Sequence, residues 1–492
     1  MRGHVLNLAD ALTSHARNIG DHEAIVEDRT SLSYGELHER ISKIAAYFSA
    51  KAFSPHAIIG VALRDTGLHL SILYGLARAG FVILPMDCRW TAVEKERVAR
   101  HFGASLTLCE RDDTLAPDIA TETVDADWLA KVERLPATRA VPSGGDTPLL
   151  LSLSSGTTGR PKGPLIAHKH FFRRFMTHWI NLGLNGRHRY ISATPLYFGG
   201  GRTFAMSVLF SGGTVIMHPP PYQPLDLIAA VERTDATSLF LVPTTLRRLL
   251  EQSDTELAPL RKLDLLISSG APLSPSERRD IKQRLCGNFF EYYASTEGGG
   301  ISLLCPEDHA HYLDSVGRPI FSVEVEVVDD SGKALPPGAV GLLRYRGPGV
   351  AEGYYRDEEA SREAFRDGWF YPGDLAALNE RGYIFLRGRR KDMILRGGIN
   401  IYPAEIEATL MLHPAVAEAA VFAMPSVEFG EEIAAFVQLR DAIVVAELRQ
   451  WCADRLAPYK RPKVITIVEA MPRNSAGKVS KSDLLALLPA EA

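Results

Sequence analysis

The residues best suited to chemistry lie in a loop rich in glycine and hydroxyl side chains. An apolar run opens the segment Leu149–Gly163, LLLSLSSGTTGRPKG, whose small residues would let the backbone approach an anion closely. Lys162 adds a positive charge, and Pro161 excludes a Walker loop because it occupies the second glycine position of that motif. A flexible polar loop is the alternative interpretation. The preceding strand and the lysine favour a phosphate-binding loop with contacts from Ser154, Ser155, Gly156, Thr157, Thr158, Gly159 and Lys162.

The ten residues SSGTTGRPKG of this loop closely resemble the signature of the adenylate-forming enzymes. This superfamily contains acyl-CoA synthetases, aryl-CoA ligases, luciferases and peptide-synthetase adenylation domains. The resemblance continues in the family's order from Ala79 to the C-terminus. The further matching segments are Ser269–Leu273, Tyr293–Glu297, Gly368–Asp374, Gly388–Asp392 with Arg396–Glu407, and Pro472–Lys478.

The resemblance implies a nucleotide site. The segment that lines the adenine pocket in the family matches Gly270, Ala271 and Pro272 here. Tyr293 would stack on adenine and Thr296 would bind phosphate. Glu297 would help to hold Mg²⁺, which prefers carboxylate and phosphate oxygens.

Two of these motifs depart from the family pattern. Ala294 stands where the family usually has glycine, which adds one methyl group to the pocket wall. Pro372 replaces a threonine, so side-chain hydrogen bonding from that position is lost. Asp374 is intact and would accept hydrogen bonds from the ribose hydroxyls.

The last two segments resemble the parts of the family that serve two half-reactions. Arg389 would contact the ribose or the α-phosphate, and Lys391 would be the hinge of a rotating C-terminal domain. Gly397 and Gly398 would line the thiol tunnel after rotation, where a side chain would block pantetheine. Lys478 would bridge the substrate carboxylate and the α-phosphate during adenylation. Two basic residues are weaker candidates for contacting the CoA nucleotide, namely Arg89 and Lys460.

The segment Pro195–Phe198 bears on the choice of acid. Many acyl- and aryl-CoA ligases have a histidine beside the acyl carboxylate where this chain has Phe198. No aspartate lies between Pro195 and Arg202, which disfavours free amino acids. The expected acyl pocket, in which glycines leave space for a bulky hydrophobic acid, comprises Phe198, Gly199, Gly200, Arg202, Gly298 and Gly299. The competing hypothesis is that Arg202 binds the second carboxylate of a dicarboxylic acid.

Composition narrows the function classes. The chain has 492 residues, of which 46% are apolar and 23% charged, and a net charge of −4, so neither wholesale disorder nor binding of nucleic acid through bulk charge is expected. The five cysteines are scattered, which argues against a disulfide scaffold and favours the cytoplasm. The N-terminus lacks a signal-peptide pattern. The apolar stretch Thr203–Met217 is too short to span a membrane, and we expect it in the core of a soluble protein.

The elements that must position these residues change character along the chain. Through the first two thirds, short apolar runs alternate with helical patterns, as in the strand Ile58–Leu63 and the helix Leu68–Ala79. This alternation is typical of βαβ units and parallel sheets. From about Val323 the pattern changes: Val323, Val325 and Val327 alternate with Glu324 and Glu326, and Gly341–Arg346 is also strand-like. This pattern predicts an antiparallel, barrel-like portion. A helix beginning at Pro403 opens a third region.

We therefore predict an α/β fold with two domains. The large N-terminal AMP-binding domain, residues 1–388, would contain two βαβ-type subdomains and a small β-barrel. The small, mobile α+β C-terminal domain would span residues 389–492 and carry the adenylation lysine. The charged run Arg387–Asp392 marks the boundary, although such a run is usually just a solvated turn.

Together the motifs predict an ATP-dependent carboxylate–CoA ligase that uses ATP, Mg²⁺ and CoA. The acid would be aryl or medium-chain, and its partners would be small molecules, with a homodimer left open. One alternative delivers the acyl-adenylate to a carrier-protein thiol or to oxygen. A second, a nucleotide-binding module without catalysis, is disfavoured by the intact Glu297, Asp374, Arg389 and Lys478. A Rossmann oxidoreductase is disfavoured because no GxGxxG follows an early strand.

Overall fold

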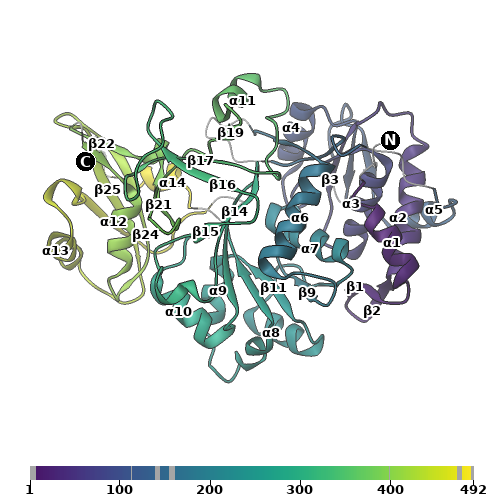
Figure 1. Cartoon of the computed structure of the whole chain (residues 1–492), viewed down its shortest axis with the longest axis horizontal. Coiled ribbons are helices and arrows are strands. Elements are labelled where there is room, and N and C mark those ends of the chain that lie inside the picture. Colours follow the sequence, from purple (N-terminus) through teal and green to yellow (C-terminus); the bar gives the residue numbers. More distant parts are fainter. Residues whose placement is uncertain are drawn as a thin grey trace.

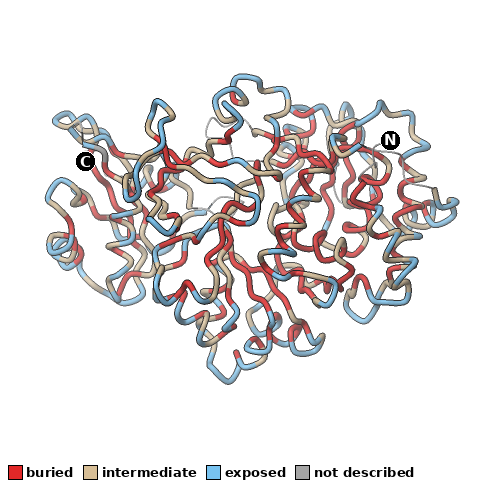
Figure 2. Tube along the Cα trace, in the orientation of Figure 1, coloured by how far each residue is buried: buried red, intermediate tan, exposed pale blue. Residues whose placement is uncertain are grey.

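The computed structural model describes residues 7–111, 114–138, 144–153, 161–397, 399–473 and 479–488. The described strands form four sheets. The helices α1, α2 and α5 lie at one end of the molecule and the C-terminal strands β22 and β25 at the other (Figure 1). Buried residues follow the strands and the inner sides of the helices in each part (Figure 2). The core is therefore divided among several units rather than gathered in one.

The sheet nearest the N-terminus is six-stranded, in the order β6-β5-β3-β4-β7-β8, and is parallel except for the pair β7–β8. Its strands are β3 (Ile58–Ala62), β4 (Val82–Pro85), β5 (Leu106–Cys109), β6 (Thr121–Thr123), β7 (Pro148–Leu151) and β8 (Leu165–Ala167). The helices of this part are α1 (Asp10–Asn18), α2 (Tyr34–Ser49), α3 (Gly67–Ala79), α4 (Ala92–Phe102) and α5 (Ala126–Glu133).

The second sheet is nine-stranded, in the order β15-β14-β13-β12-β11-β9-β10-β1-β2, with a parallel centre and antiparallel edges. Its strands are β1 (Glu23–Glu27), β2 (Thr30–Ser33), β9 (Arg189–Ser192), β10 (Thr214–Met217), β11 (Ser238–Leu241), β12 (Leu265–Ser268), β13 (Phe289–Ser295), β14 (Gly299–Leu304) and β15 (Arg318–Pro319). The associated helices are α6 (His168–Leu182), α7 (Gly199–Ser211), α8 (Pro224–Arg233), α9 (Pro243–Leu250) and α10 (Pro275–Asp280). The two predicted βαβ-type subdomains are thus present.

The third sheet is antiparallel and has six strands, with β17 pairing β16, β19 and β20. Its elements are β16 (Glu324–Val328), β17 (Gly341–Arg346), α11 (Glu358–Ala364), β18 (Phe365–Arg366), β19 (Trp369–Phe370), β20 (Asp374–Leu378) and β21 (Ile384–Arg389). Among the strands that the structure describes, no pairing joins β21 back to β16 or β18. The antiparallel character is confirmed, but the closed β-barrel is not.

The fourth sheet gathers the C-terminal strands in the order β23-β22-β25-β24, with β26 parallel to β25. Its elements are β22 (Ile394–Arg396), β23 (Ile399–Ile401), α12 (Pro403–Met411), β24 (Val416–Ser426), β25 (Gly430–Leu439), α13 (Val445–Arg455), β26 (Val464–Val468) and α14 (Lys481–Leu485). The predicted helix with proline in its first turn is α12. Helices on a mainly antiparallel sheet confirm the α+β prediction for this part.

Local sequence explains why these units form. The strands β3 and β4 are buried along their whole length, as short apolar strands of a parallel sheet covered on both faces should be. Ser33 and Glu36 form a capping box that starts α2. Gly80, with φ +77°, ends α3 and lets the chain turn into β4. The stretch Thr203–Met217 forms most of α7 and all of β10, and its residues are mainly buried, as predicted.

None of the helices in the described residues is both long enough and apolar enough to cross a lipid bilayer.

Candidate active site

Two segments far apart in the chain meet at the side chain of Glu297. The Tyr354 hydroxyl donates a hydrogen bond to Oε1 of Glu297 at 3.0 Å. Nζ of Lys162 lies 5.3 Å from the centre of the Tyr354 ring. A backbone bridge between Pro164 and Tyr354 holds the two segments together. The lysine predicted to bind phosphate and the carboxylate predicted to hold Mg²⁺ therefore flank one tyrosine.

The chemical state of this cluster follows from its burial. Glu297 is 9% exposed and lies in the turn between β13 and β14, directly after Thr296. Burial, reinforced by the negative charge of Glu297, raises the pKa of Tyr354. The tyrosine therefore stays protonated and remains a hydrogen-bond donor at neutral pH. The other predicted phosphate contacts, Ser154, Ser155, Gly156, Thr157, Thr158 and Gly159, lie outside the described residues.

A second cluster surrounds the carboxylate of Asp374. The Tyr293 hydroxyl donates a hydrogen bond to Oδ2, and Nε of Arg389 lies 3.1 Å from Oδ1. Asp374 begins β20 and Arg389 ends β21, where the two residues face each other in the antiparallel pair. Burial and the charge of Asp374 raise the pKa of Tyr293, which keeps its hydroxyl a donor. The structure thus brings together three residues that the sequence predicted for the nucleoside.

The predicted acyl and adenine segments also lie next to each other. Phe198 immediately precedes α7, and Cζ of its ring is 3.9 Å from the position that a Cβ would take at Gly270. Gly270 has φ +102°, in the turn after β12, so a side chain there would be strained. Ala271 and Pro272 continue this turn, and Ala294 lies on the neighbouring β13.

The structure corrects the reason given for the glycine runs. A Cβ at Gly200 would lie 2.7 Å from the Phe240 ring, and one at Gly299 would lie 2.9 Å from the Arg174 side chain. At Gly298 it would overlap the Tyr345 hydroxyl. These glycines allow close packing of aromatic and arginine side chains instead of leaving pocket volume. Open space occurs beside Gly199, where a Cβ would meet no atom within 4 Å.

Arg202 also differs from expectation, because it faces inward instead of into an open pocket. Its side chain is 1% exposed, and Nη1 donates to the carbonyl oxygens of Leu196 and Tyr197 at 3.0 Å each. Nη2 donates to Oγ of Ser152 at 3.3 Å. Burial, with a smaller contribution from the charge of Arg174, lowers the pKa of Arg202 to about 9. Arg202 therefore joins the acyl segment to the residue that leads into the phosphate loop.

Two residues predicted for domain rotation and for the thiol tunnel, Lys391 and Gly397, lie around the start of the C-terminal sheet. Lys391 is in a single 3₁₀ turn, Arg390–Asp392, between β21 and β22. Asp392 Oδ1 lies 3.8 Å from Nζ of Lys481. Gly397 has φ +55° and faces the Phe429 ring. Gly398 and Lys478 lie outside the described residues.

Both basic residues predicted to contact CoA are engaged with carboxylates. The Arg89 guanidinium binds Asp87 through Nε at 2.9 Å and Nη2 at 2.8 Å, and Nη2 also donates to the Tyr197 hydroxyl at 3.0 Å. Nζ of Lys460 donates to both oxygens of Glu405 at 2.6 and 2.8 Å. A CoA phosphate bound at Arg89 or Lys460 would therefore share that side chain with the carboxylate that it already binds.

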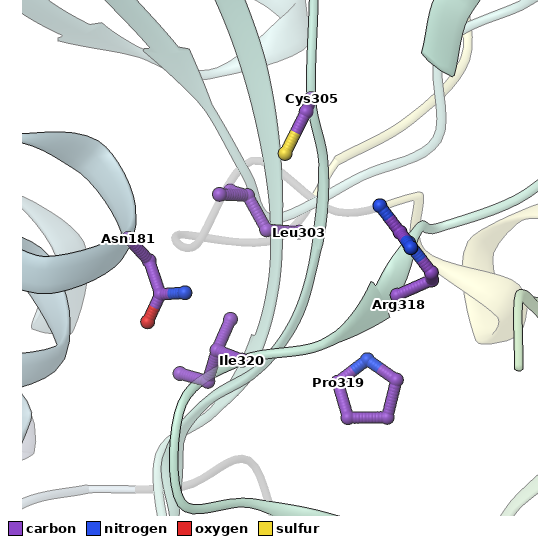
Figure 3. Close-up of a pocket in the computed structure, with 6 residues that line it drawn as sticks. All are labelled: Asn181, Leu303, Cys305, Arg318, Pro319 and Ile320. Atoms are coloured by element: carbon purple, nitrogen blue, oxygen red, sulfur yellow. The ribbon is translucent and has the colours of Figure 1, made fainter. Parts of the chain in front are cut away.

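A separate hollow of about 370 Å³ lies between the end of α6 and the strands β14 and β15 at the edge of the second sheet. Asn181 of α6 stands on one side, with Arg318 and Pro319 on the other (Figure 3). Its remaining lining residues are Leu303, Cys305 and Ile320. None of its lining residues is among those predicted for nucleotide, acid or CoA, so this hollow is not the site described above.

Two residues that help to build the site were missed in the sequence. Tyr354 lies in no recognisable motif, and only its contact with Glu297 reveals it. Asp65, after β3, accepts a hydrogen bond from the Leu196 backbone N–H at 2.8 Å and so fixes the acyl segment. Burial raises the pKa of Asp65 to about 6. Its place at the carboxyl end of a parallel strand was the available signal.

Comparison with known proteins covers both parts of the chain. The sequence profile of the AMP-binding enzymes matches residues 12–355, and that of the AMP-binding enzyme C-terminal domain matches residues 405–478. The chain belongs to the AMP-binding enzyme family. This AMP-binding enzyme is 31% identical over 477 residues to a feruloyl-CoA synthase from an Amycolatopsis species, covering 94% of the chain and 95% of the relative.

Two further comparisons place this AMP-binding enzyme among its relatives. It is 29% identical over 474 residues to a 2-succinylbenzoate–CoA ligase from Geobacillus kaustophilus, covering 95% of each chain. It superimposes on ATP-bound MatB from Rhodopseudomonas palustris with a TM-score of 0.87 and 29% identity, over 97% of this chain and 98% of that one. The similarity thus extends through both parts of the chain.

Proposed function

We propose that this AMP-binding enzyme is an ATP-dependent carboxylate–CoA ligase. The observation that carries the proposal is the double cluster around Asp374 and Glu297. Tyr293 and Arg389 at Asp374 suit a nucleoside, whereas Lys162 and Glu297, which flank Tyr354, suit phosphates and their cation. The names of the relatives, a feruloyl-CoA synthase and a 2-succinylbenzoate–CoA ligase, support CoA as the acceptor.

The proposed reaction has two steps. A carboxylate is a poor electrophile, so its oxygen first attacks the α-phosphorus of ATP, the bond to pyrophosphate breaks, and acyl-AMP forms. The CoA thiol, whose pKa is about 8.5 when free, then loses its proton to solvent and attacks the acyl carbon, and AMP leaves. Lys162 and Lys478 would offset the negative charge of phosphates and carboxylate. Positioning and charge neutralisation supply the catalysis, and no protein nucleophile is required.

The residues near Glu297 fit a Mg²⁺ ion that is bound mainly by the phosphates of ATP. No group of three or more histidine, cysteine or acidic side chains suited to a metal occurs among the described residues. Mg²⁺ commonly takes one or two carboxylates together with phosphates and water, which a single glutamate beside a phosphate site provides. Tyr354 occupies Oε1 of Glu297 and orients the carboxylate. The ion would add positive charge next to the phosphates.

Domain alternation forms part of the proposal. The N-terminal domain would end at residue 388 and the mobile domain would begin at Arg389, with Lys391 as the hinge. The 3₁₀ turn at Arg390–Asp392, which links β21 of the third sheet to β22 of the fourth, supports this position. Lys478 would enter the site for adenylation, and Gly397 and Gly398 would line the thiol tunnel after rotation.

The acid is proposed to be aryl and monocarboxylic. Arg202 is buried and donates to three protein oxygens, so binding a second substrate carboxylate would require it to give up contacts. The Phe198 ring offers an apolar face beside the open space at Gly199. Stacking of an aromatic acid on such a ring contributes about 0.5–1.5 kcal/mol beyond burial. These features favour an acid of the feruloyl type over a dicarboxylic acid.

A panel of acids tests the substrate class. With ATP and CoA, AMP release from aryl acids should exceed that from acetate by at least about 100-fold in kcat/KM, the effect of a few buried methylenes. Aliphatic and dicarboxylic acids of matched size serve as controls. A preference for acetate or malonate would contradict the assignment of Phe198 and Arg202.

Half-reactions test the role of Lys478. Lys478→Ala should reduce acid-dependent pyrophosphate release by at least about 10²-fold, the effect of losing one preorganised charge donor, and should spare thioester formation from supplied acyl-AMP. Lys481→Ala is the matched control, because this neighbouring lysine faces Asp392 at 3.8 Å. Equal losses in both half-reactions would contradict the assignment.

We also propose a cytoplasmic location. All five cysteines, Cys88, Cys109, Cys286, Cys305 and Cys452, are free thiols in the structure. Free cysteines without disulfides suit a reducing compartment. Fractionation of cells that express the protein at its natural level would test this location.

A further inference from the structure

A buried arginine lies behind the turn that carries Glu297. Arg174 of α6 is 6% exposed, and its Nε and Nη2 donate to the carbonyl oxygen of Gly349 at 3.0 and 2.9 Å. Nη2 also donates to the carbonyl oxygen of Glu297 at 2.8 Å. Nη1 is 3.4 Å from the carbonyl oxygen of Thr296. One guanidinium therefore joins two chain segments through main-chain oxygens alone.

The arginine stem fits a slot that two glycines create. A Cβ at Gly299, where φ is +72°, would lie 2.9 Å from Cγ, Cδ and Nε of Arg174. A Cβ at Gly349 would lie 3.0 Å from Cγ of Arg174. Both distances are shorter than ordinary van der Waals contact, so side chains at these positions would displace the arginine. The slot fixes the direction in which the guanidinium points.

The Arg174 guanidinium forms no ion pair with a carboxylate of the described residues. No carboxylate of the described residues lies within 4.0 Å of its guanidinium nitrogens. Burial lowers the pKa of Arg174 to about 10, while the nearby Tyr345, Tyr292 and Glu297 act in the opposite direction. The side chain is therefore charged at neutral pH, and its donors are committed to backbone oxygens. A lysine, with one ammonium group, cannot reproduce this planar set of donors.

The two segments that Arg174 joins are the ones that meet at the proposed metal carboxylate. Two residues after Gly349, the N–H of Ala351 donates to the carbonyl oxygen of Glu297 at 2.9 Å. Three residues further, the Tyr354 hydroxyl reaches Oε1 of Glu297. The guanidinium thus holds the backbone at Glu297 and at Gly349. These two segments carry the side chains that form the Tyr354–Glu297 hydrogen bond.

We propose that Arg174 is a positioning residue that sets the orientation of the Glu297 carboxylate toward Mg²⁺. The proposal rests on the proposed function, in which Glu297 holds the ion. Arg174 lies on α6, touches neither substrate nor metal, and acts through the backbone of the turn that carries Glu297. Partners that orient a metal ligand typically change metal affinity by about 10–100-fold when they are lost.

The test measures the Mg²⁺ requirement of acid-dependent pyrophosphate release at fixed ATP. In Arg174→Lys, the Mg²⁺ concentration for half-maximal rate should rise at least about 10-fold, with little change in KM for the acid. Arg173→Lys is the matched control, because the adjacent Arg173 is exposed. Its side chain makes one hydrogen bond to the described residues, a 3.5 Å contact with the Pro348 carbonyl. A purely structural role would lower stability and the amount of active enzyme without moving the Mg²⁺ midpoint.

Further variants separate the possible outcomes. If wild-type enzyme releases pyrophosphate with an acid but Arg174→Lys keeps a Mg²⁺ midpoint within about 2-fold, this inference is wrong and the proposed function stands. If Glu297→Gln leaves the midpoint unchanged, the metal assignment itself fails. If Arg174→Lys does not fold, Tyr354→Phe replaces it, because that change removes the hydrogen bond that the arginine sets in place. An unchanged midpoint in Tyr354→Phe would then overturn the inference.

Discussion

Replacing Tyr293 by phenylalanine isolates one hydrogen bond of the proposed nucleoside site. The change keeps the ring that would stack on adenine and removes only the hydroxyl that donates to Oδ2 of Asp374. Asp374 is 8% exposed, so water cannot freely replace the lost donor. Oδ1 keeps Arg389 at 3.1 Å, so the carboxylate stays paired at one oxygen but can turn. The expected result is weaker recognition of the ribose.

The magnitude follows from these contacts. A hydrogen bond to a charged group contributes about 1.5–3 kcal/mol, which corresponds to roughly 10- to 150-fold in an equilibrium constant. Arg389 is about half exposed, so its ion pair with Asp374 is worth at most about 1 kcal/mol and restrains the carboxylate only partly. Since one oxygen stays paired, the lower part of the range applies. Tyr293→Phe should reduce kcat/KM for ATP by about 10- to 30-fold.

The assay is acid-dependent pyrophosphate release at varied ATP, with the acid saturating. Tyr371→Phe is the matched control, because its hydroxyl accepts from Nη1 of Arg344 at 3.0 Å and lies in the same motif as Asp374. That control should stay within about 2-fold of wild type. If Tyr293→Phe also stays within about 2-fold, the Tyr293–Asp374 contact does not prepare the site for ATP, and the reasoning is refuted.

Three further predictions concern other parts of the molecule. A Cβ at Gly201 would lie 2.5 Å from the carbonyl oxygen of Thr194. Gly201→Ala should therefore destabilise the N-terminal part by about 3 kcal/mol in denaturant unfolding. An unchanged unfolding midpoint would contradict the packing at α7. Burial raises the pKa of Glu407 from 4.5 to about 7, so its stabilising contribution is present below pH 4.5 and is lost as the pH rises through 7. Glu407→Gln should therefore flatten the fall in stability of the C-terminal part between pH 5 and 8, and parallel curves for both proteins would contradict this. Lys391→Pro, which fixes φ at about −65°, should preserve acyl-AMP formation and slow thioester formation. Wild-type rates in both half-reactions would show that Lys391 is not the hinge.

Sequence alone predicted the side chains that the structure brings together in the proposed nucleoside site. Tyr293, Asp374 and Arg389 each lie in a motif, and the structure brings them together because β20 and β21 pair in register. The strand Gly341–Arg346 was predicted with its observed bounds, because prolines and glycines on either side delimit a short strand-like run. These features depend on local pattern and on order along the chain.

The parts that sequence could not predict depend on what lies opposite a residue in space. A glycine shows that a side chain is absent, but not that Phe240 fills the place beside Gly200. Arg174 leaves no signal at all, because its partners are main-chain oxygens that every residue carries. Closure of the third sheet likewise depends on pairing between distant strands, and no local pattern encodes it.

The position of β1 within the second sheet bears on the order in which this protein can fold. Ile25 of β1 lies opposite Val215 of β10, so a strand near the start of the chain has its neighbour far along the sequence. Such contacts require a large loop to close and form slowly. During synthesis, which proceeds from the N-terminus, the hairpin of β1 and β2 must wait without its partner until β10 has left the ribosome. In this interval the hairpin is marginally stable on its own and exposes apolar surface, which makes it the segment on which we expect a chaperone to act first.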